Sequence, residues 1–106
     1  MKVVTTEIIA GYEIIDTIGL VSGNVVQSKH LGRDIMAGLK TLIGGEISGY
    51  TEMFSEAREQ AVKRMVDNAA ALSADAVVNV RFTTSAIAPG MSELLASGTA
   101  VKLREK

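Results

Sequence analysis

The sequence predicts an α+β fold in which a β-α-β-β sheet packs against one long helix, with residues 1–106 forming a single domain. Three observations predict it. Apolar residues recur at helical spacing over residues 51–72. They alternate with polar residues over 76–84 and again over 91–104. A mean hydropathy of +0.25 is high for so small a domain, which indicates apolar surface to be buried between copies of the chain.

The N-terminal part is expected to be extended. Residues 3–6 form a short Val/Thr strand, and residues 12–27 alternate well enough for a second strand. Gly19 and Gly23 interrupt this second strand and predict bends or bulges there.

Two helices are expected to follow. A shorter one, at about residues 30–43, is indicated by apolar residues every three to four positions and ends at Gly44-Gly45. The long helix covers about residues 51–72, with Thr51 as its N-cap. Its apolar sector is made of Tyr50, Phe54, Ala57, Ala61, Met65, Ala69 and Leu72.

The C-terminal part predicts a β-hairpin. Residues 76–84 form a half-buried strand, with Ala76, Val78, Val80 and Phe82 expected on one face. A turn at residues 88–90 leads into the return strand at 91–104, in which Gly98 is expected to mark a bulge.

Composition limits the partners and the location. The 11 basic and 12 acidic residues are spread along the chain, so no basic patch for nucleic acid is expected. The absence of cysteine excludes disulfides and thiolate chemistry. No stretch has the length and hydropathy of a membrane span, and the first residues lack the apolar stretch of a signal peptide, so a cytoplasmic protein is expected.

Three polar residues are candidates for an interface or a ligand contact. On a helical wheel Arg58 and Asn68 fall inside the apolar sector of the long helix, where an arginine needs a carboxylate, carbonyls, a partner subunit or an anionic ligand. Arg81, on the polar face of its strand, raises the same question. A structural ion pair or a side chain that reaches solvent at the edge of the sector is the simpler alternative for each.

Metal binding and catalysis have little support in the residues. His30 and Asp34 are four residues apart at the start of the shorter helix and are the only weak metal-ligand candidates, since two solvated side chains at a helix start give the same pattern. With one histidine and no cysteine, no catalytic constellation is apparent. We therefore predict no catalytic residues, no enzyme activity and no cofactor, with a metal ion of unknown identity as the alternative.

Several blocks of sequence, in order along the whole chain, resemble the YbjQ family of small bacterial proteins. They are residues 19–23, Arg33-Asp34, Ala37-Gly38, Gly44-Gly45, Tyr50, residues 56–59, residues 74–81 and residues 98–101. The resemblance implies a dodecin-like β-α-β-β subunit and a ring of five copies. It implies no catalytic residues, because the activity of the family is not established.

The resemblance shapes the functional expectation. The family is described as heavy-metal-binding, and Ser73 stands where its members more usually have glycine. The chain is expected to be a homo-oligomeric scaffold or binding module whose ligand, if any, lies at subunit interfaces. The alternative is a metal-ion-binding protein.

Overall fold

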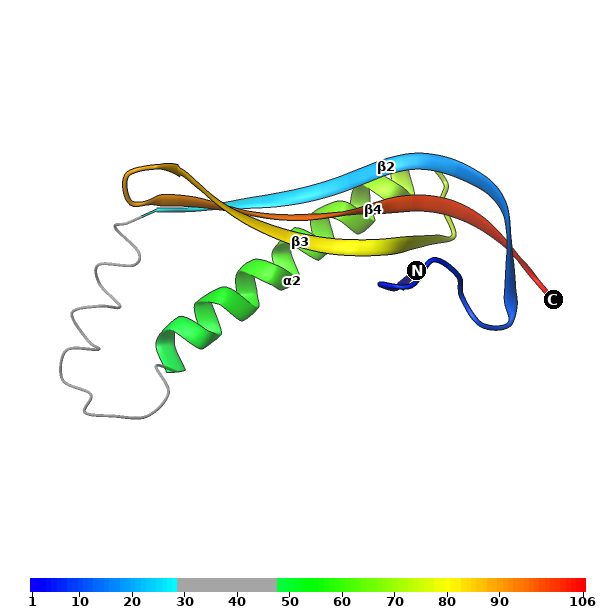
Figure 1. The fold of residues 1–106 in the computed structure, drawn as a ribbon, viewed down its shortest axis with the longest axis horizontal. Helices are drawn as coiled ribbons and strands as arrows, with labels where there is room; N and C mark the ends of the chain where they lie inside the picture. The colour runs from blue at the N-terminus through cyan, green and yellow to red at the C-terminus, as the bar shows by residue number, and fades with distance from the viewer. Residues whose placement is uncertain (29–47) are drawn as a thin grey trace.

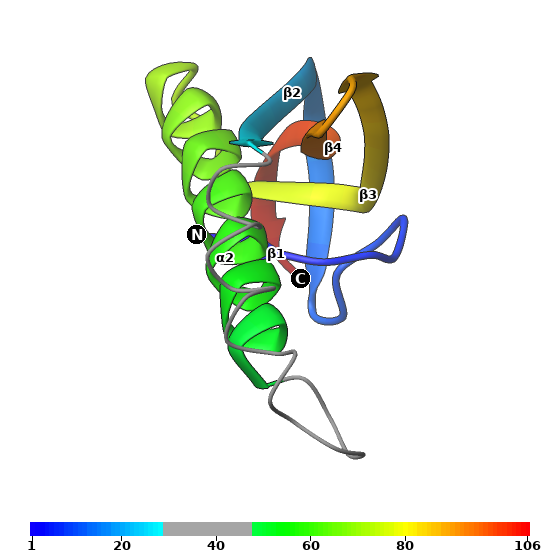
Figure 2. The ribbon, with the colours of Figure 1, turned by 90° about the vertical axis from the view of Figure 1, so that its left-hand side faces the viewer.

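The computed structural model describes residues 1–28 and 48–106, and within them the chain is α+β, as predicted. A four-stranded mixed sheet has the order β1-β3-β4-β2. The helix α2 lies along one side of it (Figures 1 and 2). The predicted helix at 30–43 lies outside the described residues. The elements are β1 (Lys2–Val3), β2 (Tyr12–Ser28), α2 (Ser48–Ala71), β3 (Ala76–Ala88) and β4 (Met91–Glu105).

The strand β2 runs for 17 residues along the edge of the sheet and pairs antiparallel with β4. Its register shifts twice, between Ile14 and Asp16 and between Thr17 and Gly19. The irregularity expected at Gly19 is confirmed, and its φ of 146° is in the region that favours glycine. A bulge at Gly23 is excluded, because pairing with β4 continues through that residue without a shift.

The helix α2 begins at Ser48, three residues before the predicted start, so Thr51 lies inside the helix and the N-cap prediction is wrong. Its C-terminus is closed by Ser73, whose φ is 60°. The Ser73 N–H donates to the Ala70 carbonyl, and the Ala74 N–H donates to the Ala69 carbonyl. This is the Schellman pattern, which places a left-handed residue directly after a helix and usually employs glycine for it.

A bulge in β3 sends its side chains to unexpected faces. The register with β4 shifts between Val78 and Arg81, and Asn79 has a φ of 55°. Ala76 and Val78 pack on one face of the sheet, whereas Val80 packs on the other. The prediction that one face carries all four apolar residues through Phe82 is therefore wrong, because an inserted residue inverts the alternation.

The bulge expected at Gly98 lies in the neighbouring strand, so that prediction is wrong. The extra residue lies in β3, opposite Gly98, and not in β4 itself. A Cβ at Gly98 would come 2.6 Å from Val77 Cγ1, so glycine provides the space beside the bulge.

Two apolar clusters hold the sheet from its two faces. On the helix side, fully buried residues of α2 pack against the strands, with Met65 the largest of them. On the opposite face the N-terminal segment contributes Ile9, which packs with Ala76, Val78 and Val101. Both clusters lie toward the end of the sheet that holds the C-terminus of α2.

Candidate functional site

The three residues predicted for an interface or a ligand contact all have hydrogen-bond partners within the chain. Arg58 is exposed and its Nη2 donates to Ser55 Oγ at 3.2 Å. Asn68 and Arg81 donate to main-chain carbonyls of other elements. The structure does not bring the three together into one site. His30 and Asp34 lie outside the described residues.

Asn68 belongs to a pair of α2 side chains that bond the edge strand β2. Its Nδ2 donates to the Ser22 carbonyl at 2.7 Å, and Arg64 Nη1 donates to the Asn24 carbonyl at 2.6 Å. Carbonyls two residues apart point to the same side of a strand. These contacts therefore fix α2 over β2 and occupy part of an exposed sheet edge. Sequence reasoning missed Arg64, although it lies one helical turn before Asn68.

Arg81 ties β3 to the N-terminal segment. Its Nη1 donates to the Thr5 carbonyl at 2.9 Å and to the carbonyl of the preceding residue, Val80, at 2.8 Å. Charge-assisted hydrogen bonds of this kind hold the chain between β1 and β2 against the sheet. Within the described residues, Arg81 thus has a structural role.

A groove separates α2 from β3 on the helix side of the sheet. It has a volume of about 520 Å³, and Phe82 forms its β3 wall with 46% of its surface exposed. The N-terminal half of α2 slants away from the sheet (Figure 1). We name it the α2/β3 groove; its lining residues are Arg58, Glu59, Val62, Lys63, Val66 and Phe82.

The end of the β3–β4 hairpin extends beyond the clusters that hold the sheet. Every residue from 81 to 91, here named the distal hairpin, is exposed, and this includes the large apolar side chains of Phe82, Ile87 and Met91. Strand residues that pack on neither face add little hydrophobic stabilisation to the single chain. The distal hairpin therefore offers surface for another layer.

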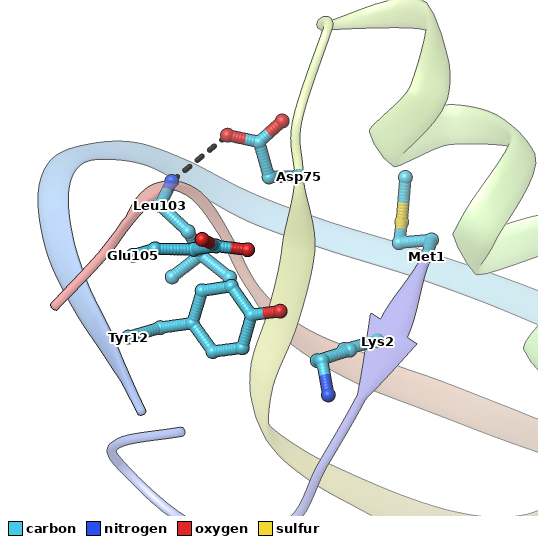
Figure 3. Close-up of a pocket in the computed structure, with 6 residues that line it drawn as sticks. All are labelled: Met1, Lys2, Tyr12, Asp75, Leu103 and Glu105. Carbon is cyan, nitrogen blue, oxygen red and sulfur yellow. Dashed lines mark hydrogen bonds between the residues drawn. The ribbon is translucent and has the colours of Figure 1, made fainter. Parts of the chain in front are cut away.

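A second hollow, of about 480 Å³, lies at the opposite end of the sheet (Figure 3). Lys2 Nζ lies 5.1 Å from the centre of the Tyr12 ring, and Asp75 accepts a 2.8 Å hydrogen bond from the Leu103 N–H. The Lys2 ammonium and the Asp75 carboxylate therefore already have partners within the chain. The hollow is lined by Met1, Lys2, Tyr12, Asp75, Leu103 and Glu105.

Comparison with known proteins places the chain among its relatives. The family model YbjQ, described as "Putative heavy-metal-binding", matches residues 1–104. The chain belongs to the YbjQ family. It is 65% identical over 97% of its length to a UPF0145 protein of Photobacterium profundum, all of which is covered. It is 58% identical over 99% of its length to a UPF0145 protein of Thermosipho africanus, of which 97% is covered.

A solved structure shares the fold of this YbjQ protein. It is a protein of unknown function of the DUF74 family from Pediococcus pentosaceus, with a TM-score of 0.61 and 18% identity. The match covers 98% of each chain. At this level of identity the likeness concerns the fold alone.

The side chains of the described residues do not fit the metal description of the YbjQ family. Soft heavy metals prefer thiolate, thioether and imidazole ligands. The chain has no cysteine and one histidine. Residues 1–28 and 48–106 contain no group of three His, Cys, Asp or Glu side chains placed to hold an ion. The described residues therefore do not form a site that fits the description. The same residues contain no helix long and apolar enough to cross a membrane.

Proposed function

We propose that this YbjQ protein is a cytoplasmic homo-oligomer, a ring of five copies, that acts as a scaffold or binding module with any ligand held at the subunit interfaces. The distal hairpin carries the proposal. Its residues are exposed on both faces of the sheet and include Phe82, Ile87 and Met91. Soluble monomers rarely leave large contiguous apolar patches exposed, whereas interfaces between copies use them.

The dimensions of one chain support the same proposal. Its strands β2 and β4 run for 17 and 15 residues, whereas a strand in a compact domain usually has about 5–6 residues. An elongated single chain buries less of its surface than a compact one, so packing against further copies compensates for this. The ring size of five comes from the family resemblance. With a formal net charge of −1, other copies of the chain are better partners than nucleic acid or a membrane surface.

The first test is the mass of the purified protein. We expect native mass spectrometry and light scattering to give five times the 11.2 kDa of one chain. The same spectrum reports any ion or small molecule that remains bound at the interfaces. A compact, folded single chain at micromolar concentration would contradict the proposal.

Metal binding is the alternative function, favoured by the family description alone. The chain offers no thiolate and one imidazole, so we expect no rise in melting temperature with Zn²⁺, Cu²⁺ or Ni²⁺. A metal bound only by the native state at 100 times its Kd would stabilise that state by about 2.7 kcal/mol. Differential scanning fluorimetry, with EDTA-treated protein as the control, detects such a shift. A reproducible rise of several degrees with one of these ions would favour the alternative.

A further inference from the structure

The helix α2 covers the sheet unevenly. Its Arg64 and Asn68 side chains bond carbonyls of the edge strand β2, and its packing is weakest against β3. A helix with its side chains is about 10 Å across, and neighbouring strands are about 4.8 Å apart. One helix therefore covers about two strands. These are β2 and β4, and residues 81–88 of β3, beyond the bulge, are exposed.

The open part of β3 combines apolar surface with a strand edge. Phe82 contributes the apolar surface, together with Val62 and Val66 across the α2/β3 groove. Pairing with β1 covers only Ala76 and Val77, and main-chain bonds from the N-terminal segment end at Val80. In the part of the chain that the structure describes, no strand lies beyond residues 82–88 on that side. An occupant that fits brings side chains to this edge and a helix above the exposed face of β3.

The opposite side of the same molecule offers such an occupant, with side chains at a strand edge and a helix above it. There β2 is the outermost strand and α2 lies directly over it, in contact at Gly23. We infer that the β3 side of one copy receives the β2–α2 side of a second copy, head to tail, an inference that rests on the proposed self-assembly. The helix of the second copy then covers the open part of β3 in the way that each chain's own α2 covers β2 and β4 (Figure 2).

Charges at the two sides agree with this pairing. Glu59 at the rim of the groove has no hydrogen bond or ion pair with any described residue. Lys63 on the same rim is neutralised by Asp67 at 3.1 Å. The incoming side carries Arg64, which uses Nη1 for the Asn24 carbonyl and keeps further N–H donors. In the proposed contact Arg64 of the second copy is the partner expected for the Glu59 carboxylate, on a rim that also carries Arg58.

The symmetry of the assembly follows from the contact. Two different surfaces meet, so each copy keeps one free surface of each kind until the ring closes. A twofold dimer would instead join like with like, β2 to β2 or β3 to β3. Rings with an odd number of members contain no twofold interface between neighbours, so the head-to-tail contact is compatible with five copies.

Paired cysteines test the contact directly, because the natural chain contains none. Thr84→Cys places a thiol on the exposed part of β3, two residues after Phe82 and on the same face. Gln60→Cys places one on the exposed surface of α2, one turn before Arg64 and toward β2. Treated with a short bis-maleimide, the double variant should give a ladder of covalent species up to the full ring. Each single variant should give none.

Each result bears on the inference separately from the proposed function. A covalent dimer from either single variant would show like surfaces meeting and would overturn the head-to-tail contact. An intact oligomer without a ladder, both with this pair and with Ala86→Cys in place of Thr84→Cys, would overturn the contact and leave self-assembly standing. A monomer by native mass spectrometry would overturn both. Circular dichroism melting identifies variants that remain folded.

Discussion

Replacing Gly23 with alanine should destabilise the fold by about 3 kcal/mol or more, at the upper end of what overpacking costs. A Cβ at Gly23 would overlap the Ala61 carbonyl oxygen and the Met65 main-chain nitrogen, and it would lie 2.8 Å from Arg64 Cβ. Two of these atoms belong to the helix backbone, so no side-chain rotation can relieve the overlap. The helix would have to move away from β2, which would also strain the bonds to the Ser22 and Asn24 carbonyls.

Urea unfolding measures this effect, and Ser22→Ala is its matched control. Ser22 precedes Gly23 in the same strand, and its bond with Asn68 uses the main-chain carbonyl, which alanine keeps. We expect the control to change the free energy of unfolding by less than about 1 kcal/mol. A protein domain of this size has about 5–15 kcal/mol in total, so Gly23→Ala should remove a large share. Equal midpoints for the two variants would mean that α2 does not press on β2 at this position.

The role of Gly23 shows where sequence reasoning about the fold stopped. Glycine within a strand indicates either a bend or a close approach of another backbone. The sequence alone could not separate these two meanings, since only the position of α2 decides between them. At Gly19 the prediction of an irregular strand was right, because a register shift is a property of the strand itself.

The β3 bulge explains the largest error about side-chain faces. The alternation from Ala76 to Phe82 in the sequence is regular, and nothing in it signals the inserted residue at Asn79. Asparagine tolerates the left-handed conformation better than most residues, which was the one available hint. By contrast, the long helix and the hairpin were predictable, since their periodicity extends over many residues.

Prediction of the candidate site was limited for a related reason. Arg58 and Asn68 were singled out because a helical wheel assumes that one sector faces a core along the whole helix. The helix instead slants across the sheet, so Arg58 reaches an open groove and Asn68 reaches a strand edge. Crossing angles depend on contacts distant in sequence, which a wheel does not contain.

Phe82→Asp should disperse the oligomer while leaving the single chain folded. Phe82 is 46% exposed in one copy and packs in neither apolar cluster, so the cost to the fold of one chain should be about 1 kcal/mol or less. In the head-to-tail contact the same position is covered by a second copy. A carboxylate buried there without a partner costs several kcal/mol. Each contact should therefore weaken by at least about 100-fold, since 1.4 kcal/mol corresponds to a factor of ten.

Thr83→Asp is the matched control, because it introduces the same charge one residue away on the opposite face of the same exposed strand. Size-exclusion chromatography with light scattering should show the control at the mass of the unchanged protein and Phe82→Asp near that of one chain. Far-ultraviolet circular dichroism should be alike for both, since neither side chain packs in an apolar cluster of the single chain. The reverse result, with Thr83→Asp dispersed and Phe82→Asp intact, would mean that copies meet across the face of β3 that α2 does not share.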